Sequence, residues 1–156
     1  MSESSILNRQ RFNVLGAVDA LTKEIITVTN TTYITSRQVC EMLAKLAEQA
    51  VAGIPITVVL DNARYQRCKL VQFYAARLGI ELLFLPPYSP NFNLIERLWK
   101  FVKKKCLYSK YYDNFDKFQR AISECLATAP TKYEGELKSL LTLKFQTFDK
   151  SSFMTV

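Results

Sequence analysis

Two acids, Asp61 and Glu96, are the residues whose types and spacing are best suited to chemistry. Asp61 closes the apolar run ITVVL at 56–60, and Glu96 lies inside the helical pattern LIERLWKFV. Between them lie 34 residues (96 − 61 − 1), enough for one helix, one strand and one loop that bring the acids back together. Carboxylates without histidine or thiolate ligands suit hard cations, so this spacing predicts a Mg²⁺ or Mn²⁺ site.

Such a site would support phosphoryl chemistry. Two divalent ions about 3.5–4 Å apart activate a water or a 3′-hydroxyl and stabilise the leaving oxygen during phosphodiester cleavage and strand transfer. Basic residues follow each acid and are predicted to contact nucleic-acid phosphates beside the metal. They are Arg64 after Asp61, and Lys100, Lys103, Lys104 and Lys105 after Glu96.

Each of these residues has a plainer alternative that the sequence leaves open. Asp61, followed by Asn62, is also typical of a turn or of the cap of the next helix. Glu96 would complete a capping box with Asn93, three residues before it. The lysine run is also typical of a solvated helix face, in which Lys100 pairs with Glu96.

Composition narrows the function classes. The chain of 156 residues has no histidine, which excludes Ser-His and Cys-His nucleophiles and every zinc site that contains histidine. Its 21 Lys and Arg against 14 Asp and Glu give a net charge of +7, which favours a polyanionic partner such as DNA. The four cysteines form no CxxC pair and are interpreted as reduced, mostly buried thiols.

The same composition indicates a globular chain without a membrane segment. Hydrophobic residues make up 49% of the chain, yet no apolar run approaches the roughly 18–20 residues that a membrane span needs. The first ten residues do not have the pattern of a signal peptide. We therefore expect a single domain over 1–156 in the cytoplasm, with no membrane partner.

Hydrophobic patterns predict the elements that must position the acids. Strands are expected at 12–20 and 24–32 as an antiparallel hairpin, followed by a helix that Thr35 or Ser36 caps. A buried strand at 56–60 and another at 80–85 should be parallel, because a single helix at 65–78 joins them. Further helices are predicted at 91–107, 113–129 and 133–143, and the tail DKSSFMTV carries little signal.

Two blocks of this sequence carry a resemblance to a known family. LDNARYQ around Asp61 and LPPYSPNFNLIERLWKFVKKK around Glu96 resemble the second and third acidic motifs of DDE transposases in the mariner-like superfamily, bacterial insertion-sequence branch. RFNVLGAVDA resembles a strand that precedes these motifs. The resemblance, which covers about 11–107, implies an α/β fold with a ribonuclease H-like mixed sheet flanked by helices. It also implies a divalent metal and the cleavage and joining of DNA at transposon ends.

The chain departs from the family pattern at its start. The family's first catalytic aspartate lies on a central strand upstream of RFNVLGA, and the chain begins too late to contain it. We therefore expect an N-terminally truncated catalytic domain, with a motif-bearing core at 11–107 and C-terminal helices at 113–143. Such a domain would have two of three metal ligands, exposed sheet edges and little activity alone.

Three sources of the third carboxylate stay open. An upstream transposase segment would supply it, as would a second copy in a homo-oligomer, or Asp19 at the end of a predicted strand. Asp19 is equally typical of a plain hairpin turn. The alternative to an enzyme is a non-catalytic DNA-binding remnant that regulates a full-length transposase.

Overall fold

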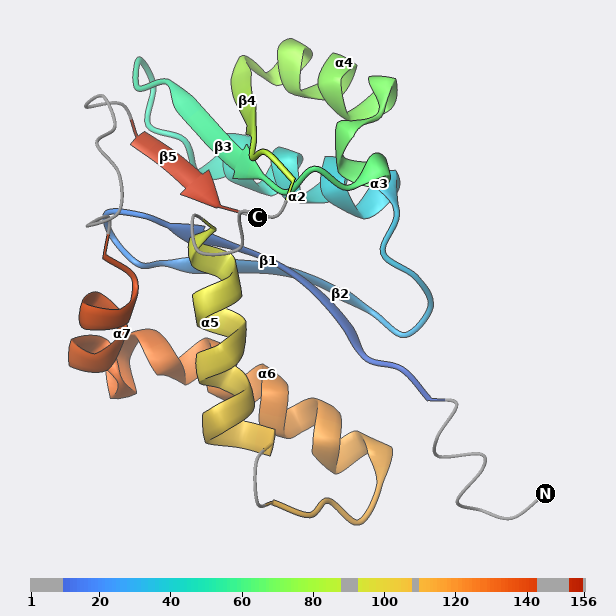
Figure 1. Cartoon of the computed structure of the whole chain (residues 1–156), viewed down its shortest axis with the longest axis vertical. Coiled ribbons are helices and arrows are strands. Elements are labelled where there is room, and N and C mark those ends of the chain that lie inside the picture. Colours follow the sequence, from blue (N-terminus) through green and yellow to red (C-terminus); the bar gives the residue numbers. More distant parts are fainter. Residues whose placement is uncertain (1–9, 88–92, 108–109, 143–151, 156) are drawn as a thin grey trace.

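The computed structural model describes residues 10–87, 93–107 and 110–142, together with the backbone of 152–155. A five-stranded mixed sheet, with strand order β2-β1-β5-β3-β4, lies between two groups of helices (Figure 1). The predicted α/β fold class, a mixed sheet flanked by helices, is confirmed. What differs is the strand at the centre of the sheet.

One half of the sheet is the predicted hairpin. β1 (Asn13–Asp19) pairs antiparallel with β2 (Ile25–Asn30) over six residue pairs. Asp19 begins the turn, and its Oδ1 accepts hydrogen bonds from the backbone N–H groups of Leu21 at 2.8 Å and Thr22 at 3.0 Å. These local bonds are those of an aspartate turn.

The other half contains the two parallel strands. β3 (Ile56–Leu60) and β4 (Ile80–Phe84) pair in parallel, as the single connecting segment predicts. Before them comes α2 (Ser36–Gln49), whose N-cap Thr35 forms a capping box with Gln38. The prediction of a cap at Thr35 or Ser36 is therefore confirmed, with Thr35 as the cap. The predicted bounds of the buried strand at 56–60 are also confirmed.

The helix predicted over 65–78 is two helices. α3 (Arg64–Arg67) ends at Cys68, whose extended backbone (φ −68°, ψ 162°) interrupts the helix before α4 (Lys69–Leu78) begins. No proline or glycine marks this break in the sequence. α4 ends at the predicted residue 78, because its C-cap Gly79 has the left-handed conformation (φ 71°, ψ 26°) that glycine adopts without steric cost.

The C-terminal helices pack on one side of the sheet (Figure 1). The helix predicted at 91–107 is α5 (Leu94–Val102), followed by a π-helical turn, η2 (Lys103–Leu107). Residues 91 and 92 lie outside the described residues. α6 (Phe115–Lys132) runs through Pro130, so its predicted end at 129 is wrong; α7 (Glu134–Leu140) follows it.

The sheet has an apolar core on each face. Leu15 and Ala17 of β1 pack with α2 and α4, whereas Val18 packs with the α5, α6 and α7 side. In β3, Val58 and Leu60 face the first core and Val59 faces the second. This alternation determines which side of the sheet each neighbouring side chain meets.

Gly16 allows α5 to approach β1 closely. A Cβ atom at this position would lie 2.7 Å and 2.8 Å from ring atoms of Trp99 and 3.2 Å from Ile95. Trp99 is thus part of the packing between helix and sheet. Because residue 16 has no side chain, the first turns of α5 can lie directly against β1.

Replacing Gly16 by Ala is expected to destabilise the fold by about 1–3 kcal/mol, because Trp99 must move to admit the methyl group. Urea denaturation measures the change. Gly135→Ala is the matched control, since a Cβ there meets nothing within 4 Å, and should leave stability unchanged or raise it by up to about 1 kcal/mol. Equal effects of the two substitutions would contradict the close packing at Gly16.

The centre of the sheet is occupied by the tail that was predicted to carry little signal. β5 (Ser152–Thr155) pairs in parallel with β3 over four residue pairs, and antiparallel with β1 at Val18 and Asp19. The expectation of two exposed inner edges is therefore wrong for this part of the sheet. The physical reason is that unpaired edges of β1 and β3 present backbone N–H and C=O groups, with which a nearby extended segment can pair. Here that segment is β5.

Candidate metal site and nucleic-acid interface

Asp61 follows β3 directly and is held by a residue from α5. Because side chains alternate along a strand, Asp61 faces the same side of the sheet as Val59, which is the α5 side. Its Oδ1 accepts a hydrogen bond from Asn93 Nδ2 at 2.8 Å. Asn93 is completely buried, so this bond is shielded from water and fixes the carboxylate.

Asn93 has a second role as the N-cap of α5. Its Oδ1 accepts a hydrogen bond from the Ile95 backbone N–H at 3.2 Å, and its backbone oxygen accepts from Glu96 N at 3.2 Å. Side chains three residues apart on a helix lie about 5–6 Å apart. The same asparagine therefore joins Asp61 to the helical turn that carries Glu96.

The structure excludes one of the alternatives for Asp61, the cap of the following helix. The N-cap of α3 is Ala63, which makes no side-chain cap hydrogen bond, so Asp61 does not cap the following helix. Asn62 accepts a hydrogen bond from Arg67 Nη1 at 2.5 Å. Asp61 and Glu96 are both half-buried, which leaves part of each side chain open to solvent.

Asn93→Ala is expected to destabilise the fold by about 1–3 kcal/mol, since a lost N-cap costs about 0.5–2 and a lost hydrogen bond about 0.5–1.5 kcal/mol. Asn93→Ser restores a cap oxygen but lacks the longer amide group that donates to Asp61, so it should recover part of this stability. Both variants should bind Mn²⁺ about 10–100-fold more weakly, as for partners that orient a ligand.

The matched control for Asn93 is Asn114→Ala. Asn114 caps α6 through a 2.9 Å hydrogen bond from Lys117 N and is exposed, so its loss should cost stability alone. Thermal unfolding and Mn²⁺ titration measure the two effects. Unchanged Mn²⁺ binding in Asn93→Ser would contradict the orienting role of the Asn93 amide.

The donors at this site fit a hard divalent cation, but they are incomplete in the described part of the chain. Asp61 and Glu96 offer carboxylate oxygens, the ligands that Mg²⁺ and Mn²⁺ prefer. Among the described residues, no three His, Cys, Asp or Glu side chains gather at one point. Asp19 does not join the pair. In the sheet register, Asp19 of β1 is opposite Met154 of β5, and Met154 is opposite Val58 of β3. Val58 lies three residues before Asp61, so Asp19 is far from it along the strand.

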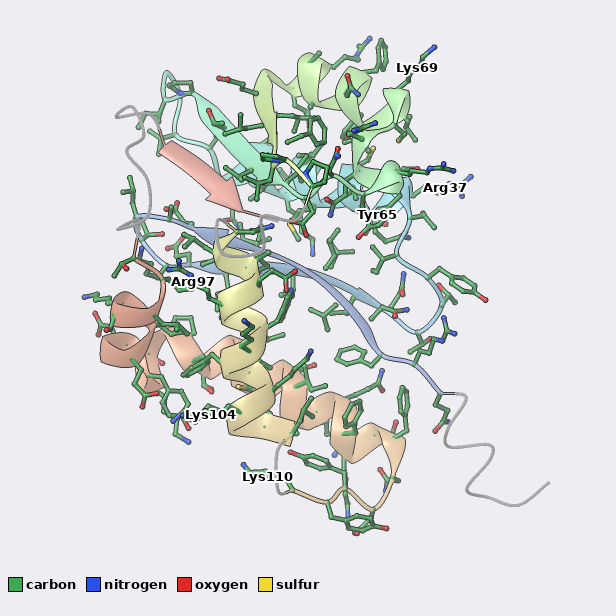
Figure 2. The ribbon with its side chains drawn as sticks, in the orientation of Figure 1. Arg37, Tyr65, Lys69, Arg97, Lys104 and Lys110 are labelled. Carbon is green, nitrogen blue, oxygen red and sulfur yellow. The ribbon has the colours of Figure 1, made fainter. Side chains whose placement is uncertain are left out.

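Tyr65 is a residue near the site that sequence reasoning missed. Its pKa is raised, first by burial and second by the negative charge of Asp61, while a hydrogen bond with Gln66 opposes the shift. Figure 2 shows Tyr65 at the start of the α3 segment. A tyrosine four positions after an acid is a weak signal, because only the fold brings the two side chains together.

The predicted nucleic-acid contacts are available at the surface. Lys100 lies on α5, and Lys103 and Lys104 lie on η2 (Figure 2 labels Lys104). In the described residues, Lys100 makes no ion pair with Glu96, whereas the alternative of a solvated helix face stays open. Exposed side chains are found at all four predicted contacts, Arg64, Lys100, Lys103 and Lys104.

Lys105 has a structural role instead. Its Nζ lies 3.2 Å from Glu136 Oε2 and 4.6 Å from the centroid of the Tyr133 ring. It also lies 5.6 Å from the centroid of the Phe101 ring. These contacts tie η2 to α7 and leave Lys105 less suited to DNA than its neighbours.

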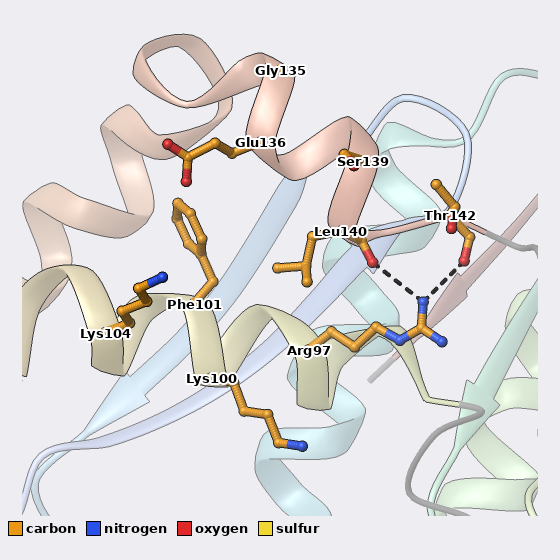
Figure 3. A pocket seen from close by; sticks show the side chains of 9 residues that line it. All are labelled: Arg97, Lys100, Phe101, Lys104, Gly135, Glu136, Ser139, Leu140 and Thr142. Carbon is orange, nitrogen blue, oxygen red and sulfur yellow. Dashed lines mark hydrogen bonds between the residues drawn. The ribbon is translucent and has the colours of Figure 1, made fainter.

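A groove separates α5 from α7 (Figure 3). Arg97 spans one end of it and donates hydrogen bonds to the backbone oxygens of Leu140 at 3.2 Å and Thr142 at 3.1 Å. These oxygens lie at the C-terminal end of α7, where a cation is favourable. Lys100 and Lys104 line the same groove, so its α5 wall is basic.

Two predictions from composition are answered by the remaining side chains. All four cysteines are free thiols, with Cys106 and Cys125 buried and Cys40 and Cys68 half-buried. Burial and the neighbouring Cys106 raise the pKa of the Cys125 thiol to about 12, so it is unreactive. Within the described ranges, no helix has the length and apolar character to cross a membrane.

Comparison with known proteins now identifies the class. A family model for DDE superfamily endonucleases matches residues 2–119, which include both acids and all the basic residues discussed above. The chain therefore belongs to the DDE superfamily of endonucleases. The membership agrees with the mixed sheet and with acids placed at a strand end and in a helix.

Individual relatives are more distant. An uncharacterized protein of Sinorhizobium fredii, y4pE/y4sA, is 26% identical over 84 residues, which cover 54% of this chain and 60% of that protein. The chain thus spans less than two thirds of this relative. One similar chain comes from a solved structure of a simian T-cell lymphotropic virus intasome in complex with the PP2A regulatory subunit B56 gamma. It is 20% identical to this chain, with a TM-score of 0.47. The match covers 78% of this chain and 42% of that one.

Proposed function

We propose that this chain is the C-terminal part of a DNA transposase of the mariner-like superfamily, bacterial insertion-sequence branch. It contributes Asp61 and Glu96 to a divalent-metal site that cleaves DNA at transposon ends and joins the strands. The observation that supports this most is the buried Asn93 side chain, which bonds Asp61 and caps the turn that carries Glu96. Membership of the DDE endonuclease superfamily supports the reaction class.

The chain's own residues would act on the DNA in three ways. Asp61 and Glu96 hold Mg²⁺ or Mn²⁺, and Asn93 keeps the Asp61 carboxylate oriented. When bound, the metal lowers the pKa of a water or 3′-hydroxyl and stabilises the leaving oxygen. Arg64, Lys100, Lys103 and Lys104 position the DNA backbone through its phosphates.

We propose that this site is completed by a carboxylate from another polypeptide. The two acids of the described site are one short of the three carboxylates that the family resemblance implies, and Asp19 is engaged in its turn. An upstream transposase segment is the proposed source. The chain is then a truncated catalytic domain with little activity alone.

Nicking of supercoiled plasmid in Mg²⁺ or Mn²⁺ tests this proposal. Residues 1–156 alone should leave the plasmid intact, and nicking should begin when the upstream coding segment from the same locus is supplied. Efficient nicking by the chain alone would contradict the missing ligand. No nicking under either condition, together with salt-sensitive DNA binding, would favour the alternative of a non-catalytic DNA-binding remnant.

A further inference from the structure

A cavity lined by aromatic rings lies between the end of η2 and the start of α6. Its volume is about 560 Å³, within the range of about 300–1,000 Å³ that is usual for ligand pockets. Neither the two site acids nor the lysines of α5 and η2 line it. The aromatic side chains that line it are Tyr111, Tyr112, Phe115 and Phe118. The proposed function therefore leaves this cavity without a role.

Three of these rings are held in place by contacts within the chain. The Tyr112 hydroxyl donates a hydrogen bond to the backbone oxygen of Cys106, a buried residue of η2. The rings of Tyr112 and Phe118 pack edge to face with 6.0 Å between centroids, and Phe115 stacks on Phe118 at 6.2 Å. All three side chains are half-buried, so each keeps some surface that a ligand can reach. A wall of fixed rings lowers the entropy cost of binding.

Tyr111 differs from these three, because its ring is almost fully open to solvent. Its side chain is 87% exposed, more than any other large apolar or aromatic side chain in the described part of the chain. A tyrosine ring contributes to stability mainly through the area that it buries. Packing within the fold therefore does not explain this ring, and its two faces are available to a ligand.

The charge around the cavity is positive. Lys110 lines it, is exposed and makes no ion pair with any described residue. Asp113 also lines the cavity, but its carboxylate pairs with Lys117 Nζ at 2.6 Å. Lys104 precedes the cavity on η2, and Figure 2 labels Lys104 and Lys110 at the lower end of α5 in that view. The cavity thus suits a ligand that combines an apolar ring with negative charge.

A nucleotide in a single strand of DNA has this combination. Its base offers two flat faces to aromatic side chains, and its phosphate carries the negative charge. In a duplex, neighbouring bases cover these faces, so only an unpaired base can stack on a protein ring. An apolar peptide segment would use the rings but not Lys110.

We propose that this cavity binds an unpaired nucleobase of a DNA strand, with Tyr111 stacked on the base and Lys110 beside its phosphate. Such a site goes beyond the proposed function, because it adds a contact that unpaired DNA makes and duplex DNA does not. It requires neither Asp61 and Glu96 nor a divalent metal.

Anisotropy of a fluorescein-labelled thymidylate oligomer of roughly ten nucleotides, measured in EDTA, tests the base contact. The comparison ligand is an abasic oligomer of the same length, which keeps the phosphates and lacks the bases. Tyr111→Ala should lower the affinity for thymidylate roughly 5–100-fold, the usual cost of one lost base stack, and should leave binding of the abasic oligomer unchanged. Tyr111→Trp keeps a flat ring and should restore thymidylate binding. Because Tyr111 is exposed, Tyr111→Ala should remain folded, which circular dichroism checks.

Two further variants test the phosphate contact and the specificity of the ring. Lys110→Ala should weaken binding of both oligomers and make the slope of log K against log salt concentration shallower by about 0.7, the value for one phosphate contact of a single strand. Tyr33→Ala is the matched control, because Tyr33 is 68% exposed and has a cationic neighbour, with Arg11 Cζ 5.7 Å from its ring centroid. Tyr33 does not line the cavity, so Tyr33→Ala should bind both oligomers like the unsubstituted chain.

The two oligomers give clear contrary outcomes. An equal loss for thymidylate and the abasic oligomer in Tyr111→Ala would overturn the nucleobase site, as would a loss in Tyr33→Ala as large as in Tyr111→Ala. No loss for either oligomer would also overturn it and would favour an apolar segment of a protein as the occupant. Because the assay contains no free divalent metal, a failed nicking experiment would leave this site standing, and its failure would leave the proposed metal site standing.

Discussion

Asp61→Asn and Glu96→Gln are each expected to reduce metal-dependent nicking in the complemented assay by more than about 100-fold, since loss of a partner that merely orients a ligand already costs about 10–100-fold. Asparagine at residue 61 still presents an oxygen to the Asn93 amide, from which Asp61 now accepts a hydrogen bond. Glutamine at residue 96 preserves the shape of that side chain. The charge is therefore removed with little change in packing.

The matched control for the acid variants is Asp19→Asn. The Asp19 side chain serves the β1–β2 turn as an acceptor, a role that asparagine keeps. Its nicking rate should equal that of the unsubstituted chain. A loss in Asp19→Asn as large as in Asp61→Asn would contradict the assignment of the two site acids.

Replacing Lys100, Lys103 and Lys104 together by Ala is expected to lower DNA affinity roughly 10–100-fold at low salt. The slope of log K against log salt concentration should become shallower by up to about 2.7, or about 0.9 for each lost phosphate contact. The physical reason is that these exposed lysines release counterions when they contact phosphate. Because phosphate contacts read no sequence, the loss should be similar for different DNA sequences. Filter binding over a salt series measures both quantities.

Two other lysines provide controls for this result. Lys138 is exposed and pairs with Glu134 at 2.7 Å, so Lys138→Ala should leave DNA affinity almost unchanged. Lys105→Ala should lower stability through its contacts with Glu136 and Tyr133, with little effect on the salt slope. An equal loss of slope in Lys138→Ala would show that net charge, rather than the proposed contact surface, determines binding.

The elements that were predicted correctly have strong local signals. The strand Ile56–Leu60 is an unbroken apolar run between Pro55 and Asp61, and the left-handed Gly79 ends the helix before β4. The break at Cys68 has no such signal. β5 has only four residues, and its position depends on the edges of β1 and β3, so local pattern does not predict it.

At the site, too, contacts between residues close in the sequence could be predicted, whereas contacts between distant residues could not. The sequence indicates Asn93 as a helix cap, because that role depends on residues two or three positions away. Its second bond reaches Asp61 across 32 positions, and Gly16 meets Trp99 across the sheet. The spacing of the two acids predicts that the fold brings them together, and their metal role stays a prediction. The asparagine that connects Asp61 to the turn of Glu96 could not be predicted in this way.

The most direct test of the central claim is a Mn²⁺ titration of the full chain followed by nuclear magnetic resonance. Paramagnetic Mn²⁺ broadens the amide signals nearest to it, so weak binding is sufficient. We predict that broadening centres on Asp61 and Asn62 and on the first turn of α5, and that it disappears in the Asp61→Asn, Glu96→Gln double variant. Broadening centred on other acids, such as Glu134 and Glu136, or unchanged in the double variant, would contradict a metal site built from Asp61 and Glu96.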